Sequence, residues 1–188
     1  MKYYLIPFIL YLVVALAIAY FFDNTFIAYT LAMIVTGVLL ILFWDKYKLK
    51  FKFDVWVVTF GVLIFLSWIL LQGRYPLLFE TSSFVPTNLI QWAVRLFGFV
   101  IITPLIEELF TRGFLIRYLV KQDWKKVRVG KFTWLSFIVT VLFFGLSHGE
   151  WLQGLVAGVL LNLLYYRSRS VGSCVLAHGI ANLLLLLF

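Results

Sequence analysis

Seven long apolar stretches, joined by short polar connections, make up most of this 188-residue chain. Most of them are close to the roughly 20 residues that an α-helix needs to cross the hydrocarbon core of a bilayer. Because lipid offers no hydrogen-bond partners, such a stretch folds as a helix there. We therefore predict an all-α membrane protein, a polytopic bundle of about seven transmembrane helices, or of eight if Pro104 breaks the fourth stretch. The stretches are residues 4–22, 26–44, 55–71, 89–119, 132–148, 151–166 and 171–188.

The composition excludes most other classes of protein. Hydrophobic residues make up 64% of the chain and charged residues 13%, with a mean hydropathy of +1.03, whereas soluble domains are about half apolar and a quarter charged. A water-soluble domain of this size could not bury so many apolar side chains. A soluble enzyme, a disordered chain and a nucleic-acid-binding module are therefore excluded. We expect membrane lipids, and no nucleic acid, beside the basic residues.

The lysines and arginines predict the orientation of the bundle. Most of them gather in three connections, residues 46–52, 121–131 and 167–169, and the cytoplasmic loops of membrane proteins carry such an excess. With seven spans and a cytoplasmic N-terminus, all three connections fall on the cytoplasmic side. We expect a multi-pass membrane protein with an uncleaved first span. It forms a single domain, in which residues 1–88 carry no motif and residues 89–188 form a motif-bearing core.

Three groups of polar residues interrupt the apolar stretches, where ionisable side chains are costly and therefore point to a function. They are Glu107, Glu108 and Arg112; then His148; and then His178 with Asn182. Residues four apart share a helix face, so Glu108 and Arg112 can form an ion pair. Glu107 is turned by about 100° from Glu108 and is left free. His178 and Asn182 likewise present an imidazole and an amide on one face.

Together these groups can activate a water molecule. A carboxylate can act as a general base, and a neutral histidine can hold the same water or relay its proton. A second histidine and an asparagine that donate N–H groups can form an oxyanion hole. Ser147 is not placed as a nucleophile for His148, because neighbours on a helix do not face each other. The pattern therefore favours hydrolysis by water.

The same residues also have structural interpretations. A buried Glu–Arg pair is often a lock between helices, and a membrane histidine often forms a bridging hydrogen bond. A non-enzymatic membrane protein, such as an immunity or protein-sorting partner, is therefore the alternative function. A transporter that carries protons on Glu107 and His178 is a third, although no internal repeat supports it. Gly154 and Gly158 form a GxxxG pattern, which indicates close helix packing and nothing more.

Three short motifs occur in order along the second half of the chain. Residues 107–112 match EExxxR, residues 144–148 match FxxxH with Phe144 in first place, and residues 178–182 match HxxxN. In this order, within successive apolar stretches, they resemble the CAAX protease and bacteriocin-processing family, the intramembrane glutamate proteases that include the type II CAAX prenyl protease. The resemblance covers about residues 89–188, roughly half of the chain, and implies a location in a prokaryotic cell membrane.

The resemblance implies an intramembrane endopeptidase whose substrate is a peptide or protein, with or without an attached lipid. Glu107 would be the base that activates water, and His148 would help to hold that water. His178 and Asn182 would stabilise the oxyanion. The residues that orient and support the site would be Glu108, Arg112 and Phe144.

Zinc is the metal that this set of residues would allow, because two histidines and a glutamate can bind it. The three residues come from different helices, however, and lack the His-Glu-x-x-His spacing of the usual zinc peptidases. We therefore expect no metal and no other cofactor.

The depths of the three groups in the membrane do not match on simple counting. At 1.5 Å per residue, His178 lies about 10 Å from the inner face, Glu107 about 15 Å and His148 about 24 Å. A cavity, a tilted or shortened fifth span, or a re-entrant turn at residues 149–154 must therefore bring them together.

Overall fold

The structure, a computed structural model, describes residues 1–22, 25–80 and 84–188. Within these ranges the chain forms helices and connecting loops and no strand, so the all-α prediction is confirmed. The seven predicted stretches correspond to seven long helices whose ends differ from the prediction by at most two residues. The α-helices are α1 (Lys2–Phe22), α2 (Thr25–Leu42), α3 (Trp44–Tyr47), α4 (Val55–Leu71), α5 (Leu89–Phe97), α6 (Thr103–Glu108), α7 (Ile116–Val120), α8 (Trp134–Leu146), α9 (Trp151–Ser168) and α10 (Val171–Leu187), with a short 3₁₀ helix, η3 (Trp124–Lys126).

The helices α5, α6 and α7 are parts of one continuous helix, Leu89–Val120, of 32 residues. Two π-helical segments interrupt its α-helical register, η1 (Gly98–Ile102) and η2 (Leu109–Leu115). In η1, the N–H of Thr103 donates to the carbonyl of Gly98, five residues earlier. The backbone hydrogen bonds thus reach back five residues instead of four immediately before Pro104, which has no N–H to donate. Pro104 therefore does not break the fourth stretch, and no eighth long helix forms there.

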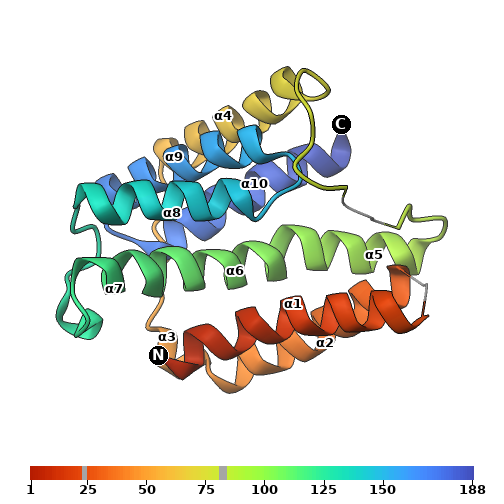
Figure 1. The fold of residues 1–188 in the computed structure, drawn as a ribbon, viewed down its shortest axis with the longest axis horizontal. Helices are drawn as coiled ribbons and strands as arrows, with labels where there is room; N and C mark the ends of the chain where they lie inside the picture. Colours follow the sequence, from red (N-terminus) through yellow and green to blue (C-terminus); the bar gives the residue numbers. More distant parts are fainter. Residues whose placement is uncertain (23–24, 81–83) are drawn as a thin grey trace.

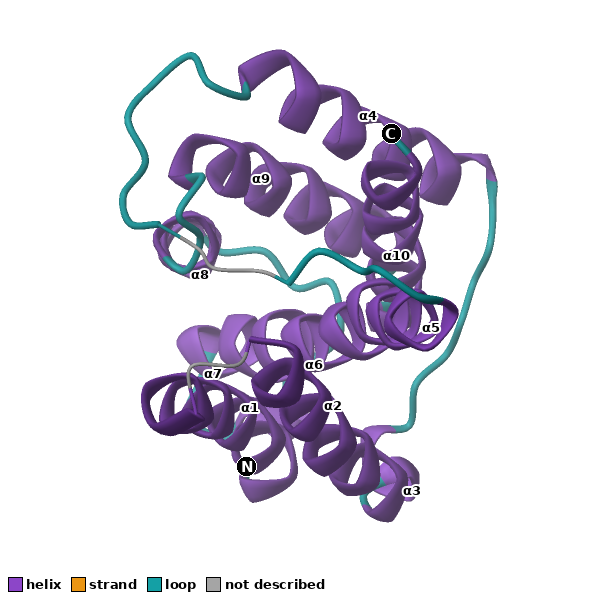
Figure 2. Cartoon of the chain, turned by 90° about the vertical axis from the view of Figure 1, so that its right-hand side faces the viewer, coloured by secondary structure: helices purple, strands orange, loops and turns teal. Residues whose placement is uncertain are grey.

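The long helix runs through the middle of the molecule (Figures 1 and 2). The hairpin of α1 and α2 packs on one side of it, and α8 and α10 pack on the other. Helix α9 lies against α8, and α4 lies against both α9 and α10. One apolar core fills the space between the α1–α2 hairpin and the long helix, and a second lies among α4, α9 and α10. The long helix therefore presents different sides to two separate layers.

Capping side chains fix the start of four helices. Asp54, Asn88, Thr133 and Ser170 each accept a hydrogen bond from a backbone N–H three residues later, which satisfies a donor that the first turn leaves free. Thr133 makes α8 begin at Trp134, and the helix ends at Leu146. The fifth apolar stretch is thus a helix of only 13 residues, shorter at both ends than expected.

Glycines bring α8 and α9 into close contact. A Cβ atom on Gly154 would lie 3.0 Å from the Cα of Gly145 and 3.2 Å from the carbonyl oxygen of Phe144. A Cβ on Gly158 would lie 3.3 Å from both the Cβ of Phe144 and the Cα of Val141. These neighbours are mostly backbone atoms, which cannot move aside. The GxxxG pattern is therefore confirmed as a helix-packing signal.

The three basic connections meet at one end of the bundle. Lys48 and Lys50 precede α4, Arg128 lies between α7 and α8, and Arg169 lies between α9 and α10, yet all four line the same cavity. At the opposite end, the N–H of Leu78 donates to the carbonyl of Gly149. The three basic connections therefore lie on one side of the bundle, as predicted.

Two helices among the described residues are long and apolar enough to cross a membrane by length and composition, Thr25–Leu42 and Leu89–Val120. Other apolar helical segments are shorter, between 10 and 17 residues. At 1.5 Å per residue, α8 spans about 20 Å, which is less than the roughly 30 Å hydrocarbon core of a typical bilayer. The multi-pass topology therefore stays a prediction.

Replacement of Gly154 by alanine should lower the free energy of unfolding by about 1–2 kcal/mol, because the new methyl group meets backbone atoms of α8. Gly37→Ala is the matched control, since a Cβ there meets only the Cδ1 of Ile102, at an ordinary 3.7 Å, and alanine favours a helix. Unfolding of both purified variants in detergent measures the difference. Equal stability of the two variants would contradict the close α8–α9 contact.

Candidate active site

Arg112, on η2, is a fully buried cation that joins the long helix to α9. Its Nε donates to Oδ1 of Asn162 (3.1 Å) and its Nη2 to the carbonyl of Gly158 (3.1 Å). Its Nη1 donates to Oε1 of Glu108 and to Oγ1 of Thr111, both at 3.0 Å. Removing a guanidinium from water costs several kcal/mol unless such partners replace the water. These bonds therefore fix how the long helix lies against α9.

Glu108 extends this network to α10. Its Oε1 accepts hydrogen bonds from Arg112 and from Nδ1 of His178, which lies 3.1 Å away. Because a carboxylate oxygen only accepts, Nδ1 of His178 carries a proton and Nε2 is the nitrogen left for other partners. Glu108 is 0% exposed and His178 is 6% exposed. The predicted Glu108–Arg112 ion pair is confirmed, and His178 is an additional partner that the spacing did not indicate.

Phe144 lies between the two histidines and Arg112. Its ring centroid is 4.9 Å from that of His148, 5.8 Å from that of His178 and 4.8 Å from the Cζ of Arg112. The Phe144 ring is 2% exposed, so it shields the guanidinium from solvent and adds a cation–π contact. The FxxxH and HxxxN motifs therefore meet at this phenyl ring.

His148 lies beyond the end of α8, in the turn before α9. Its Nδ1 is 2.6 Å from the carbonyl oxygen of Phe144, and a carbonyl can only accept, so Nδ1 carries a proton. In the neutral ring the lone pair is then on Nε2. Trp68 of α4 packs edge-on against the imidazole, with centroids 5.8 Å apart. A shortened fifth span is one of the arrangements that we expected to bring His148 towards the other polar groups, and it is the one that the structure shows.

Glu107 differs from Glu108 in its contacts. Glu108 bonds to Arg112 and to His178 of α10 through its Oε1. Glu107 is half-buried, and its Oε2 is buried without a hydrogen-bond partner among the described residues. Within the same residues, no hydrogen bond or ion pair joins Glu107 to His148 or His178. Oε2 of Glu108 is likewise unpartnered, so the two adjacent carboxylates differ in one respect: Glu108 is bonded through its Oε1, whereas no hydrogen bond or ion pair among the described residues reaches Glu107.

Asn182 is tied to the π-helical segment η1. Its Nδ2 donates to the carbonyl of Phe99 at 2.7 Å. In π-helical register that carbonyl would pair with residue 104, which is a proline without an N–H. Gly179, one turn earlier on α10, allows this approach, because a Cβ there would lie 2.9 Å from the carbonyl of Val100. Asn182 therefore satisfies a carbonyl that Pro104 leaves free, and its second N–H remains for another acceptor.

Asn162 is a site residue that the sequence analysis missed. It is fully buried, accepts from Arg112, and donates through Nδ2 to Oγ1 of Thr140 at 2.9 Å. A signal was present, because Asn162 is a single amide within the leucine-rich run of residues 160–164, and a buried amide needs a partner. The spacing of residues could not show that its partner is Arg112, which lies 50 residues earlier in the chain.

Metal-ligating side chains do not cluster in the described ranges. Across residues 1–22, 25–80 and 84–188, no three His, Cys, Asp or Glu side chains gather in a way that could hold a metal ion. Glu108 and His178 do lie in contact, but they are two side chains and not three, and Glu108 is already bonded to Arg112.

Asn162→Leu should lower the free energy of unfolding by about 2–3 kcal/mol, because Nε of Arg112 would lose its acceptor while staying buried. Leu163→Ala is the control on the same helix: Leu163 is 46% exposed, and exposed positions change stability by about 0.5 kcal/mol or less. Equilibrium unfolding of the purified variants measures both. An Asn162→Leu protein as stable as the parent would show that Arg112 does not depend on this amide.

Comparison with known proteins places the motif-bearing half in a family. The family model described as type II CAAX prenyl endopeptidase Rce1-like matches residues 89–184, which runs from the start of α5 into α10 and covers half of the chain. The matched segment contains Arg112, Glu108, Phe144 and both histidines. No curated protein and no solved structure matches the chain. The chain therefore belongs to the type II CAAX prenyl endopeptidase Rce1-like family, a family of membrane proteases.

Proposed function

We propose that this protein is an intramembrane endopeptidase in which Glu107 activates a water molecule for attack on a peptide bond. The observation that carries the proposal is the difference between the two adjacent carboxylates. Glu108 is neutralised by Arg112 and held by His178, and a carboxylate in an ion pair is a weaker base. Glu108 keeps only its Oε2 unpartnered, whereas no hydrogen bond or ion pair among the described residues reaches the carboxylate of Glu107, so Glu107 is available to accept a proton from water.

The proposed reaction has two steps. Glu107 takes a proton from water as the water oxygen attacks the carbonyl carbon of the peptide, which forms a tetrahedral oxyanion. The protonated carboxyl group of Glu107 then gives that proton to the amide nitrogen, the C–N bond breaks, and an amine and a carboxylic acid leave. His148 supports the first step, because its Nδ1 bond to Phe144 leaves the Nε2 lone pair to accept the second hydrogen of the water.

The oxyanion is the proposed partner of His178 and Asn182. Asn182 uses one amide hydrogen on Phe99 and has a second one to donate. His178 can donate from Nε2 only in its doubly protonated form, because its Nδ1 hydrogen is bonded to Glu108. The bond from Nδ1 to Glu108 fixes the orientation of the ring, which gives the buried Glu108–Arg112 pair a role in positioning His178.

The substrate that we propose is a peptide or protein that reaches the site from the membrane. The family takes its description from prenylated substrates, so a lipid-bearing peptide is the first one to test. We propose a reaction without a metal ion, because the described His, Cys, Asp and Glu side chains form no cluster that suits one. An activity unchanged by a zinc chelator would agree with this.

We further propose that the bundle is a multi-pass membrane protein with a cytoplasmic N-terminus. Large apolar side chains cover its outer surface, including Ile41 (75% exposed), Leu70 (58%) and Ile138 (49%), and a surface of this kind is stable in lipid and not in water. The basic connections lie together at the end that also contains Met1, as the excess of positive charge on cytoplasmic loops requires.

Labelling with a membrane-impermeant maleimide tests this orientation. Arg74 and Lys125 are both exposed, at opposite ends of the bundle. In intact cells, Arg74→Cys should react and Lys125→Cys should react only after permeabilisation. The parent is the control, because its single cysteine, Cys174, is fully buried. The reverse labelling pattern would contradict the proposed orientation.

A non-enzymatic membrane partner is the second candidate function. The bonds from Arg112 to Glu108 and Asn162 favour it, because they would lock helices together whether or not chemistry follows. This alternative gives no role to the free carboxylate of Glu107, so the two candidates differ at that residue.

Glu107→Gln should reduce peptide hydrolysis by at least about 100-fold, because glutamine cannot accept a proton as a general base. The rate is measured on reconstituted protein with prenylated and unprenylated peptides of the same sequence. Glu80→Gln is the control, since it makes the same chemical change at an exposed position, and both variants should unfold like the parent. Full activity in Glu107→Gln would contradict the role of Glu107. An inactive parent on every peptide would favour the non-enzymatic alternative.

A further inference from the structure

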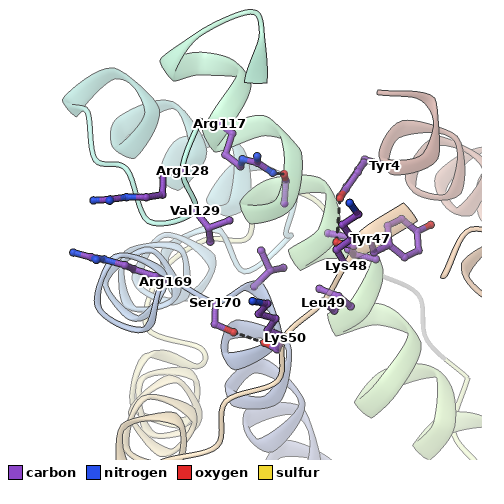
Figure 3. A pocket seen from close by; sticks show the side chains of 13 residues that line it. Tyr4, Tyr47, Lys48, Leu49, Lys50, Arg117, Arg128, Val129, Arg169 and Ser170 are labelled. Carbon is purple, nitrogen blue, oxygen red and sulfur yellow. Dashed lines mark hydrogen bonds between the residues drawn. The ribbon is translucent and has the colours of Figure 1, made fainter. Parts of the chain in front are cut away.

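A second site lies at the basic end of the bundle, away from the proposed peptidase residues. Five cationic side chains from four separate segments line one cavity of about 310 Å³, and Figure 3 shows that the side chains of Arg128 and Arg169 extend away from Lys48 and Lys50. Among the lining residues that the structure describes, none is acidic. The cations are Lys48, Lys50, Arg117, Arg128 and Arg169.

The fold holds these cations together. Arg117 is positioned by the carbonyls of Val127 and Lys125, which accept from its Nε (3.0 Å) and Nη2 (3.1 Å). Arg169 lies directly over Gly130, where a Cβ would come within 2.7 Å of its Cγ. The connection between α7 and α8 is therefore fixed against both the end of α7 and the start of the α9–α10 connection. An anion in the cavity would offset the positive charge of the residues that line it.

The start of α10 faces the same cavity. Ser170, the N-cap of this 17-residue helix, accepts from the N–H of Ser173 and donates to the carbonyl of Lys50. Gly172 allows this contact, because a Cβ there would lie 2.5 Å from the same carbonyl. The connection that carries Lys50 is thus hydrogen-bonded to the N-terminus of α10, and the dipole of that helix also favours an anion.

Apolar and neutral groups complete the wall. Leu49, Leu109 and Val171 line the cavity beside the cations. Tyr47 also lines it, and burial, together with the neighbouring Tyr4, raises the pKa of its hydroxyl group. The tyrosine therefore stays neutral at physiological pH and does not offset the positive charge. A wall of this composition suits a ligand that has both an anionic and an apolar part.

We propose that this cavity binds the phosphate group of an anionic phospholipid, with the glycerol and the first acyl carbons against the apolar wall. The ligand chemistry is that of a phosphate, and the apolar wall and the position at the end of the bundle favour a lipid over free phosphate as its source. The inference rests on the proposed membrane placement and not on the proposed peptidase chemistry.

Binding of a short-chain lipid to the purified full chain tests the proposal without a bilayer. Dioctanoyl phosphatidylglycerol is titrated against the protein in a non-ionic detergent, and bound lipid is counted by native mass spectrometry. Lys48→Gln/Lys50→Gln should weaken binding by about tenfold or more, because each lysine near an anionic lipid contributes about one kcal/mol. Lys121→Gln/Lys131→Gln removes the same charge from exposed positions outside the cavity and should weaken binding by about twofold or less.

Three results would overturn the proposal. Equal weakening by the two double variants would show that the positive charge attracts lipid without a defined site. Phosphatidylcholine of the same chain length binding as tightly would show that the anionic charge is not recognised. Inorganic phosphate that binds as tightly as the lipid would identify free phosphate as the ligand. Arg128→Gln/Arg169→Gln is a second variant of the cavity, so a folding defect in the first pair does not end the test.

Discussion

The buried charge of Arg112 is the constraint on which the arrangement of this bundle depends. A guanidinium without water requires a partner for each nitrogen, and these come from the long helix and from α9. Phe144 of α8 covers its face, and Glu108 passes the network to His178 of α10. Four helices thus meet at one cation, and the long helix could not slide past α9 or α10 without leaving a buried polar group unpaired.

The same constraint separates two adjacent carboxylates that share a helix. Glu108 is used to balance Arg112 and to orient His178, whereas no hydrogen bond or ion pair among the described residues reaches the carboxylate of Glu107. A peptidase needs this division, because one carboxylate must hold the site while the other exchanges a proton. The π-helical segment that begins at Leu109 places Arg112 in this geometry, and such segments are frequent at functional sites.

Much of the helical layout could be predicted from the sequence, because hydropathy marks each long helix and its ends within two residues. The Glu108–Arg112 pair and the use of Gly154 and Gly158 in close helix packing also followed, since each depends on spacing within one helix. The partner helix of those glycines, α8, did not follow from the sequence. The contacts of His178 with Glu108 and of Asn162 with Arg112 did not either, because they join segments that are 70 and 50 residues apart. The catalytic roles stay predictions, because no described contact joins Glu107 to either histidine.

The central claim is that Glu107 and His148 act on one water molecule, and a double-mutant cycle on peptide hydrolysis tests it most directly. The rates of Glu107→Gln, His148→Ala and the double variant are compared with that of the parent under single-turnover conditions. Residues that act as a unit are non-additive, so the double variant should be no slower than the slower single variant. Losses that multiply in the double variant would show that the two residues act independently and would contradict the shared water.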